Sequence, residues 1–220
     1  MNYIAWREFA ENYFHYINTE LSGLNLTALK TVDDIYTKQV LDSIEPVFQL
    51  TVFEQVLLQA AYVVDLGTGG GFPLLPIAKQ FPETKCVGID ARNKKLLAVK
   101  KIAHFLNLKN VSVIHATFEE IVFDQKKTVF LIKAVGKIYE ILEKLNIKFP
   151  SHIFFYKGAN FYQLEIEELG KLNNNYQLVG VYEINITGIE KRYLVHFETH
   201  DNVPRGTQAS RQLKAFSECL

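Results

Sequence analysis

Four glycines between two acids are the residues of this 220-residue chain best suited to hold a ligand. Asp65 precedes the glycines, which are Gly67, Gly69, Gly70 and Gly71. The second acid, Asp90, lies 90 − 67 = 23 residues after the first glycine. A glycine turn lets bare backbone N–H groups approach a ligand, and a carboxylate about 20 residues further on accepts hydrogen bonds from a ribose. The pattern predicts a nucleoside-containing cofactor; the alternative is a turn that binds nothing.

This turn needs a strand before it and a helix after it. Residues 60–66 are apolar except for Asp65, which is typical of a buried strand, and Pro73 supplies the fixed φ of a first helical turn. A second apolar run, 86–89, leads directly to Asp90. Because ligands of open α/β sheets bind beyond the carboxyl ends of the strands, we expect the turn and Asp90 to share one pocket.

Strands and helices alternate from residue 61 onward. We predict strands at 61–66, 85–89, 111–115, 128–133 and 152–156, and helices at 73–80, 92–107, 137–147 and 161–173. This order gives βαβ units and a mostly parallel sheet with right-handed crossovers. Two further strands, 176–186 and 190–197, with a turn at Thr187-Gly188, predict an antiparallel hairpin that closes the sheet.

Residues 1–60 predict a helical extension before this α/β domain. An apolar stripe with spacings of three and four comprises Trp6, Phe9, Ala10, Tyr13 and Ile17. Core packing accounts for Trp6 and Tyr13 better than RNA stacking does. Further helices are expected over 33–44 and 53–59, with Pro46 ending the first of them or starting a turn.

The glycine turn also resembles a known signature. The segment Gly67-Thr68-Gly69-Gly70-Gly71-Phe72-Pro73-Leu74-Leu75-Pro76-Ile77-Ala78 is similar to G-T-G-x-G-x-P-G-x-P-L/I-A of the RsmG (GidB) family, which methylates bacterial small-subunit ribosomal RNA. Shorter matches follow the family order at Asn25-Leu26-Thr27, Val40-Leu41-Asp42-Ser43-Ile44, Lys157-Gly158 and Lys191-Arg192-Tyr193-Leu194-Val195. The resemblance runs from the first helix to about Phe197. It implies a class I methyltransferase fold, S-adenosylmethionine (AdoMet) as cofactor, and methyl transfer to N7 of a guanine in the decoding-centre loop of 16S rRNA.

The resemblance assigns residues to the cofactor and to RNA. The cofactor set at four strand ends is Asp65, Gly67, Thr68, Gly69, Gly71, Phe72, Asp90, Ala116, Thr117, Phe118, Glu119 and Lys133. The RNA set is Lys133, Lys157 and Arg192, with Lys133 as the candidate for substrate positioning. No general base is expected, because guanine N7 has a free lone pair and no proton. The alternatives are a helix cap for Asp90, a core residue for Phe118 and solvated surface for the three cations.

Four departures from the family indicate a divergent member. Lys133 replaces an arginine in S/T-R-A, Thr117 an arginine in R-x-E, Gln39 a histidine, and Lys127-Thr128 a Phe-Asp pair. They concern the RNA contacts and leave the cofactor half intact. An AdoMet-dependent methyltransferase for another RNA or a small substrate, and a non-catalytic AdoMet- or RNA-binding module, therefore stay open. An NAD-dependent oxidoreductase is disfavoured, because Phe72 replaces the last glycine of G-x-G-x-x-G.

Composition limits the partners. With 24 basic and 24 acidic residues the chain is neutral, which leaves room for only a local basic face toward RNA. No apolar run of 18 residues and no secretory signal pattern occur. We expect a cytoplasmic monomer that binds 16S rRNA or the small ribosomal subunit, with no membrane contact and no obligate protein partner. Cys86 and Cys219 form neither a disulfide framework nor a zinc site, so no metal is predicted.

The chain divides into an extension (1–60), an AdoMet-binding domain (61–197) and a tail (198–220). Within the tail, Val203-Pro204-Arg205-Gly206 resembles the core of an engineered thrombin site. The alternative is a native disordered tail with a short helix near Arg211 to Glu218.

Overall fold

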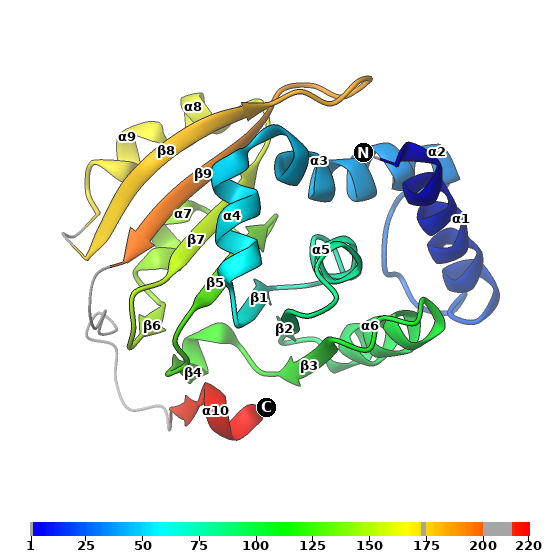
Figure 1. The fold of residues 1–220 in the computed structure, drawn as a ribbon, viewed down its shortest axis with the longest axis horizontal. Coiled ribbons are helices and arrows are strands. Elements are labelled where there is room, and N and C mark those ends of the chain that lie inside the picture. The colour runs from blue at the N-terminus through cyan, green and yellow to red at the C-terminus, as the bar shows by residue number, and fades with distance from the viewer. Residues whose placement is uncertain (1, 173–174, 200–212) are drawn as a thin grey trace.

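The computed structural model describes residues 2–172, 175–199 and 213–220. Its centre is a seven-stranded sheet of order β3-β2-β1-β5-β7-β9-β8 (Figure 1). The parallel strands are β1 (Tyr62–Leu66), β2 (Lys85–Asp90), β3 (Val111–His115), β5 (Thr128–Lys133) and β7 (His152–Lys157). Strands β8 (Tyr176–Ile184) and β9 (Arg192–Thr199) add the antiparallel hairpin. The predicted mostly parallel sheet with a C-terminal hairpin is confirmed.

Alternate residues of the buried strands supply two separate cores. Val63 belongs to one core and Val64 to the other, because successive side chains of a strand point to opposite faces. The first core lies under α5 (Leu74–Gln80), α6 (Asn93–Phe105) and the N-terminal helices. The second lies under α7 (Ile138–Leu142), α8 (Phe161–Leu164) and α9 (Ile166–Leu169). Parallel strands buried on both faces read as continuous apolar runs, which is why the sequence located them.

The N-terminal extension packs onto the first core instead of standing apart. It consists of α1 (Tyr3–Thr19), α2 (Val32–Ile35), a π-helical turn η1 (Tyr36–Leu41), α3 (Asp42–Gln49) and α4 (Thr51–Gln59). Trp6 and Tyr13 are buried in this core, as expected. The prediction that Pro46 ends a helix is wrong, since Pro46 lies inside α3. Burial of every residue from Asp42 to Val47 outweighs the backbone hydrogen bond that proline cannot donate.

Two predicted helices are shorter than expected. The helix over 137–147 ends at Leu142 and is followed by β6 (Asn146–Ile147), and the helix over 161–173 is broken at Glu165. Three further short elements were not predicted: η2 (Phe118–Glu120), β4 (Ile121–Phe123) and β10 (Lys214–Ala215). Strands β10, β4 and β6 form a second, three-stranded sheet. Strands of two or three residues are too short to show an alternating pattern.

The short helix expected near the C-terminus is present as α10 (Phe216–Cys219). It is not part of a separate tail, because it packs against the second core near β4 (Figure 1), and β9 continues to Thr199. Phe216 is fully buried and meets the rings of Tyr62 and Phe123. An aromatic side chain with two ring partners holds this end in place. The segment Val203-Pro204-Arg205-Gly206 lies outside the described residues.

None of the helices in the described part of the chain has the length and apolar character needed to cross a bilayer.

Candidate cofactor and RNA site

The glycine turn and Asp90 form one hydrogen-bonded unit. Gly67 and Gly69 have positive φ angles of 72° and 55°, which glycine adopts without steric cost. Gly67 N and Thr68 N donate to Ile89 O at 2.7 and 3.1 Å, so the turn is tied to the end of β2. Gly69 N donates to Asp90 Oδ2 at 3.0 Å. The two strand ends therefore position the turn and the acid together, as the sequence predicted.

Gly71 fixes the exit from the turn, and its replacement is expected to destabilise the fold. Its φ is 93°, and a Cβ there would lie 2.5 Å from Leu75 Cδ1 and 2.9 Å from Leu75 Cγ. We expect Gly71→Ala to lower the free energy of unfolding by about 2–4 kcal/mol, because left-handed strain adds to overpacking. Gly23→Ala is the matched control, since no atom lies within 4 Å of a Cβ at that position. Urea unfolding measures both, and equal changes would contradict this account of the turn.

Two adjoining cavities lie against the turn. The first, of about 360 Å³, is lined by the predicted residues Gly67, Asp90, Ala116, Thr117, Phe118 and Glu119. The second, of about 210 Å³, is lined by the predicted residues Gly67, Thr68, Gly69, Phe72 and Lys133. Asp65 and Gly71 line neither cavity and support the turn from behind. The structure thus gathers nearly the whole predicted cofactor set in one place.

Two residues that the sequence analysis missed line both cavities. One is Arg92, whose Nε and Nη2 donate to Asp90 Oδ1 and Oδ2 at 3.1 and 3.2 Å. The other is Ala134, which follows β5 with a φ of 56°. A residue with a Cβ rarely adopts this left-handed conformation, and such strain gathers at functional sites. Arg92 follows a strand-end acid, a signal the sequence does contain, whereas nothing in the sequence indicates the backbone of Ala134.

Asp90 is ionised at neutral pH. Burial by itself would raise its pKa, but hydrogen bonds from the Arg92 side chain, Arg92 N and Gly69 N bring the pKa below the ordinary value. The carboxylate is therefore a strong acceptor at the wall of the first cavity. It also accepts from Arg92 N at 2.8 Å, just before α6 begins at Asn93. Arg92 itself is the N-cap of α6 and no side chain caps this helix, so the helix-cap role considered for Asp90 is not observed.

Asp65 lies behind the turn with incomplete hydrogen bonding. Its Oδ2 accepts from Leu74 N at 3.3 Å, at the start of α5. Its Oδ1 and the hydroxyl of Thr68 are buried and have no partner at hydrogen-bond geometry among the described residues. Burial raises the pKa of Asp65 to about 7, although the nearby Thr68 and Leu74 N–H act in the opposite direction. Because Asp65 lines neither cavity, its carboxyl supports the turn and the start of α5 from behind.

The raised pKa of Asp65 predicts a pH dependence of stability. In the unfolded chain this carboxyl titrates near 3.8, so between about pH 4 and 7 the folded state binds more protons. The free energy of unfolding should therefore fall as pH rises through this window. Relative to Asp65→Asn, which cannot titrate, we expect the wild type to lose about 2–3 kcal/mol between pH 5 and pH 8. Urea titrations of both proteins at both pH values test this. If the wild type and Asp65→Asn differ in free energy of unfolding by the same amount at pH 5 and pH 8, the prediction is wrong.

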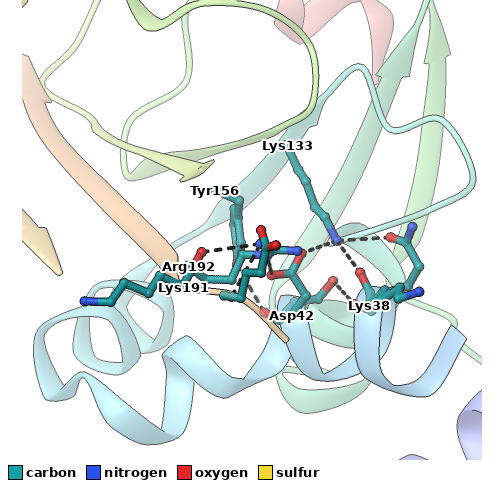
Figure 2. Close-up of polar contacts among 9 residues, drawn as sticks. Lys38, Asp42, Lys133, Tyr156, Lys191 and Arg192 are labelled. Atoms are coloured by element: carbon teal, nitrogen blue, oxygen red, sulfur yellow. Dashed lines mark hydrogen bonds and ion pairs between the residues drawn. The ribbon is translucent and has the colours of Figure 1, made fainter. Parts of the chain in front are cut away.

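Two of the predicted RNA-binding cations meet on one buried acid. Lys133 Nζ, from the end of β5, lies 2.7 Å from Asp42 Oδ2, and Arg192 Nε, from the start of β9, lies 3.1 Å from Asp42 Oδ1. Figure 2 shows both side chains converging on Asp42 at the start of α3. The side chains of Lys133 and Asp42 are only 13% and 6% exposed. Asp42, which the sequence analysis did not single out, therefore fixes the position of Lys133 at the second cavity.

Two of the four departures from the family are in direct contact. Lys133 Nζ donates to Gln39 Oε1 at 3.0 Å and to Lys38 O at 3.3 Å. Gln39 belongs to the π-helical turn η1, and both side chains line the second cavity. An amide oxygen accepts from an ammonium group, so the residues at 39 and 133 suit each other. The replacements that looked separate in sequence form one local arrangement.

Lys157, the third predicted RNA contact, lies in a different ion pair. Its Nζ is 2.8 and 2.9 Å from the two carboxylate oxygens of Glu165 and donates to Gly136 O at 2.9 Å. Both side chains of the pair are nearly buried. Burial lowers the pKa of Lys157 below its ordinary value, and Glu165 offsets only part of this. Lys157 therefore lies apart from the cluster formed by Asp42, Lys133 and Arg192.

Known proteins resemble this chain in sequence and in fold. The family model for rRNA small subunit methyltransferase G matches residues 7–195. Ribosomal RNA small subunit methyltransferase G of Pseudothermotoga lettingae is 30% identical over 88% of this chain and 86% of its own length. The protein of that name from Petrotoga mobilis is 30% identical over 90% of this chain and 92% of its own length.

Solved structures share the fold at low sequence identity. A SAM dependent methyltransferase from Aquifex aeolicus has a TM-score of 0.52 at 19% identity, over 72% of this chain and 93% of that chain. Magnesium protoporphyrin IX methyltransferase from Synechocystis, with bound SAM, has a TM-score of 0.55 at 12% identity, over 87% of this chain and 97% of that chain. These likenesses concern the fold, while the sequence match extends from α1 into β9. The chain belongs to the rRNA small subunit methyltransferase G family.

Proposed function

We propose that this protein transfers the methyl group of AdoMet to N7 of a guanine in bacterial 16S rRNA. The observation that carries the proposal is the pair of adjoining cavities in which the glycine turn, Asp90 and Lys133 meet. The family indicates the class of reaction, and the cavities offer room for both the cofactor and the guanine of the RNA.

The first cavity suits the nucleoside part of AdoMet. The ionised carboxylate of Asp90 would accept hydrogen bonds from the ribose hydroxyls. The segment Ala116 to Glu119 would flank the adenine, with Phe118 offering an apolar edge. The second cavity would hold the methionine part against Thr68 and Gly69. When bound there, AdoMet supplies a methyl group already activated by its sulfonium.

The lining of the second cavity suits a reaction without a general base. Its charged side chains are Arg92, Lys95 and Lys133, and the described residues that line it include no carboxylate and no histidine. Guanine N7 has no proton to remove, so a base has nothing to do in this reaction. Cationic side chains instead suit RNA phosphates, which fix the register of the bound strand. The rate would rest on holding N7 in line with the methyl group, which is catalysis by proximity and orientation.

Lys133 is the residue we propose for positioning the RNA. A guanine in a loop must be splayed out of its stack to reach the cavity. Lys133, held by Asp42 and Gln39, would contact this nucleotide at the entrance. Arg192 would act through Asp42 in the same cluster, and Lys157 would contact the RNA separately.

Methyl transfer to purified particles tests the proposal. Small ribosomal subunits from a strain that lacks its own methyltransferase G would receive labelled AdoMet and this protein, followed by digestion to nucleosides and mass spectrometry. We expect 7-methylguanosine. A different methylated nucleoside would indicate another RNA substrate, and AdoMet binding without transfer would indicate a non-catalytic module. In calorimetry, AdoMet and its demethylated product should bind and NAD should not.

We further propose that the protein acts as a monomer in the bacterial cytoplasm, without an obligate protein partner. The support for the location is that small ribosomal subunits, the proposed substrate, are cytoplasmic. Light scattering of the purified protein should give the mass of one chain, 25.3 kDa. A stable dimer would show this part of the proposal to be wrong.

A further inference from the structure

Two histidines and a glutamate gather at the end of the sheet opposite to the cofactor cavities. His152 begins β7, and His196 and Glu198 lie in the last part of β9. The antiparallel register pairs His152 with Glu198 and Phe154 with His196. Since residues two apart in a strand point to the same face, all three side chains share one face of the sheet.

The distances within this cluster suit a metal ion. His152 Nδ1 lies 3.1 Å from His196 Nε2 and 3.4 Å from Glu198 Oε1. One ligand atom from each residue lies within 4.8 Å of the others. In a tetrahedral zinc site, bonds of about 2.0–2.1 Å place the ligand atoms about 3.3 Å apart. The two short distances bracket this value, so small side-chain shifts would complete a site.

Neighbouring residues hold His196 in place and leave His152 and Glu198 accessible to solvent. The ring of His196 is fully buried and stacks on Phe154 with the centroids 4.2 Å apart. Its Nε2 faces the cluster, while its Nδ1 has no partner among the described residues. The side chains of His152 and Glu198 are 37% and 42% exposed. His152 also lines a cavity of about 580 Å³ beside Val56 and Gln59 of α4, through which an ion and a water could enter.

Imidazole nitrogen is the commonest metal ligand in proteins, and two of the three side chains in this cluster supply it.

We propose that His152, His196 and Glu198 bind one divalent transition-metal ion of the zinc class, with a water molecule as the fourth ligand. Two imidazoles and one carboxylate suit zinc, whereas Mg²⁺ and Ca²⁺ prefer oxygen ligands. The ion would join the first residue of β7 to the end of β9, away from the cofactor cavities. The two cysteines gave no metal-binding pattern, and the two histidines are 44 residues apart, so the sequence predicted no metal.

The competing account is a hydrogen bond between the two imidazoles with no ion. Calorimetry of chelator-treated protein with ZnCl₂ and, separately, MgCl₂ distinguishes the two. We expect one equivalent of zinc to bind and no saturable binding of magnesium at the same concentrations. Co²⁺ in place of zinc should give the visible absorption of a four-coordinate ion.

Single variants connect the ion to these residues. His152→Asn and Glu198→Gln should each weaken zinc binding by at least about tenfold, because loss of even an outer-shell partner costs that much. His104→Asn, an exposed histidine on α6, is the matched control and should bind zinc as the wild type does. AdoMet affinity should be unchanged in all three, which shows that they are folded. Absence of zinc binding by the folded wild type, or unchanged binding in both cluster variants, overturns the proposal.

Discussion

Lys133→Ala is expected to slow methyl transfer to the small ribosomal subunit by about 100-fold or more, with AdoMet affinity nearly unchanged. Lys133 is the cation at the second cavity that both Asp42 and Gln39 hold in place. Its loss removes the group proposed to position the RNA, and a small misplacement of the reacting atoms has a large kinetic effect. Single-turnover transfer of labelled methyl, measured beside calorimetry with AdoMet, separates the two quantities.

The same change also affects stability, so its controls matter. In Lys133→Ala, Asp42 keeps its ion pair with Arg192 but loses the shorter one with Lys133. We expect the free energy of unfolding to fall by about 1.5–3 kcal/mol. Rates must therefore be compared well below the unfolding temperature. Lys133→Arg keeps the charge and restores the family residue, so it should retain or raise activity. Lys94→Ala, an exposed lysine of α6, should have no effect.

Each deviation from this result has a specific meaning. If Lys133→Ala transfers methyl at the wild-type rate, the residue is structural and the RNA approaches elsewhere. If the variant loses AdoMet binding, Lys133 belongs to the cofactor site and the substrate must enter from another side. Asp42→Asn, which leaves Lys133 present but poorly held, should lower transfer less than Lys133→Ala does.

Asp90→Ala is expected to weaken AdoMet binding by about 1–3 kcal/mol, which corresponds to roughly 5- to 150-fold in affinity. The ribose would lose a charged acceptor whose pKa shows that it is ionised. Gly69 N would lose its partner as well, so the turn would be held less firmly. Calorimetric titration with AdoMet gives the effect directly.

Arg92→Ala tests whether the guanidinium competes with the ribose for the Asp90 carboxylate. It removes the guanidinium that contacts both carboxylate oxygens but keeps the carboxylate itself. We expect this variant to bind AdoMet at least as well as the wild type. If Asp90→Ala instead keeps full affinity and loses about 1.5–3 kcal/mol of stability, Asp90 serves solely to hold the backbone at Gly69 and Arg92.

The features that could be predicted are those set by residues close together in the sequence. Strands β1, β2, β5 and β7 were predicted because each is an apolar run buried on both faces, whereas only Ile114 is buried in the edge strand β3. The turn and Asp90 were predicted to lie together because both are at strand ends of one βαβ unit. Strands β4, β6 and β10 were missed, since two or three residues carry no period. The length of α7 was overestimated because its apolar pattern continues into β6.

The contacts that hold the candidate site are not local and could not be predicted. Asp42 and Arg192 are 150 residues apart in sequence, yet they share an ion pair. Asp42 begins α3, Lys133 ends β5 and Arg192 begins β9, and a single sequence does not show that these three positions meet. For the same reason the His152–His196 contact appears only once β7 and β9 are paired. Periodicity locates elements, whereas only their packing locates clusters of charge.

Mass mapping of 16S rRNA from a strain that lacks this gene tests the central claim most directly. We predict that one guanine in the decoding-centre loop loses a methyl group. Expression of the wild-type gene should restore that methyl group, whereas the Lys133→Ala gene should leave most molecules unmethylated. Identical maps from the deletion and parent strains, or a methyl group lost from another nucleotide, would contradict the proposed function.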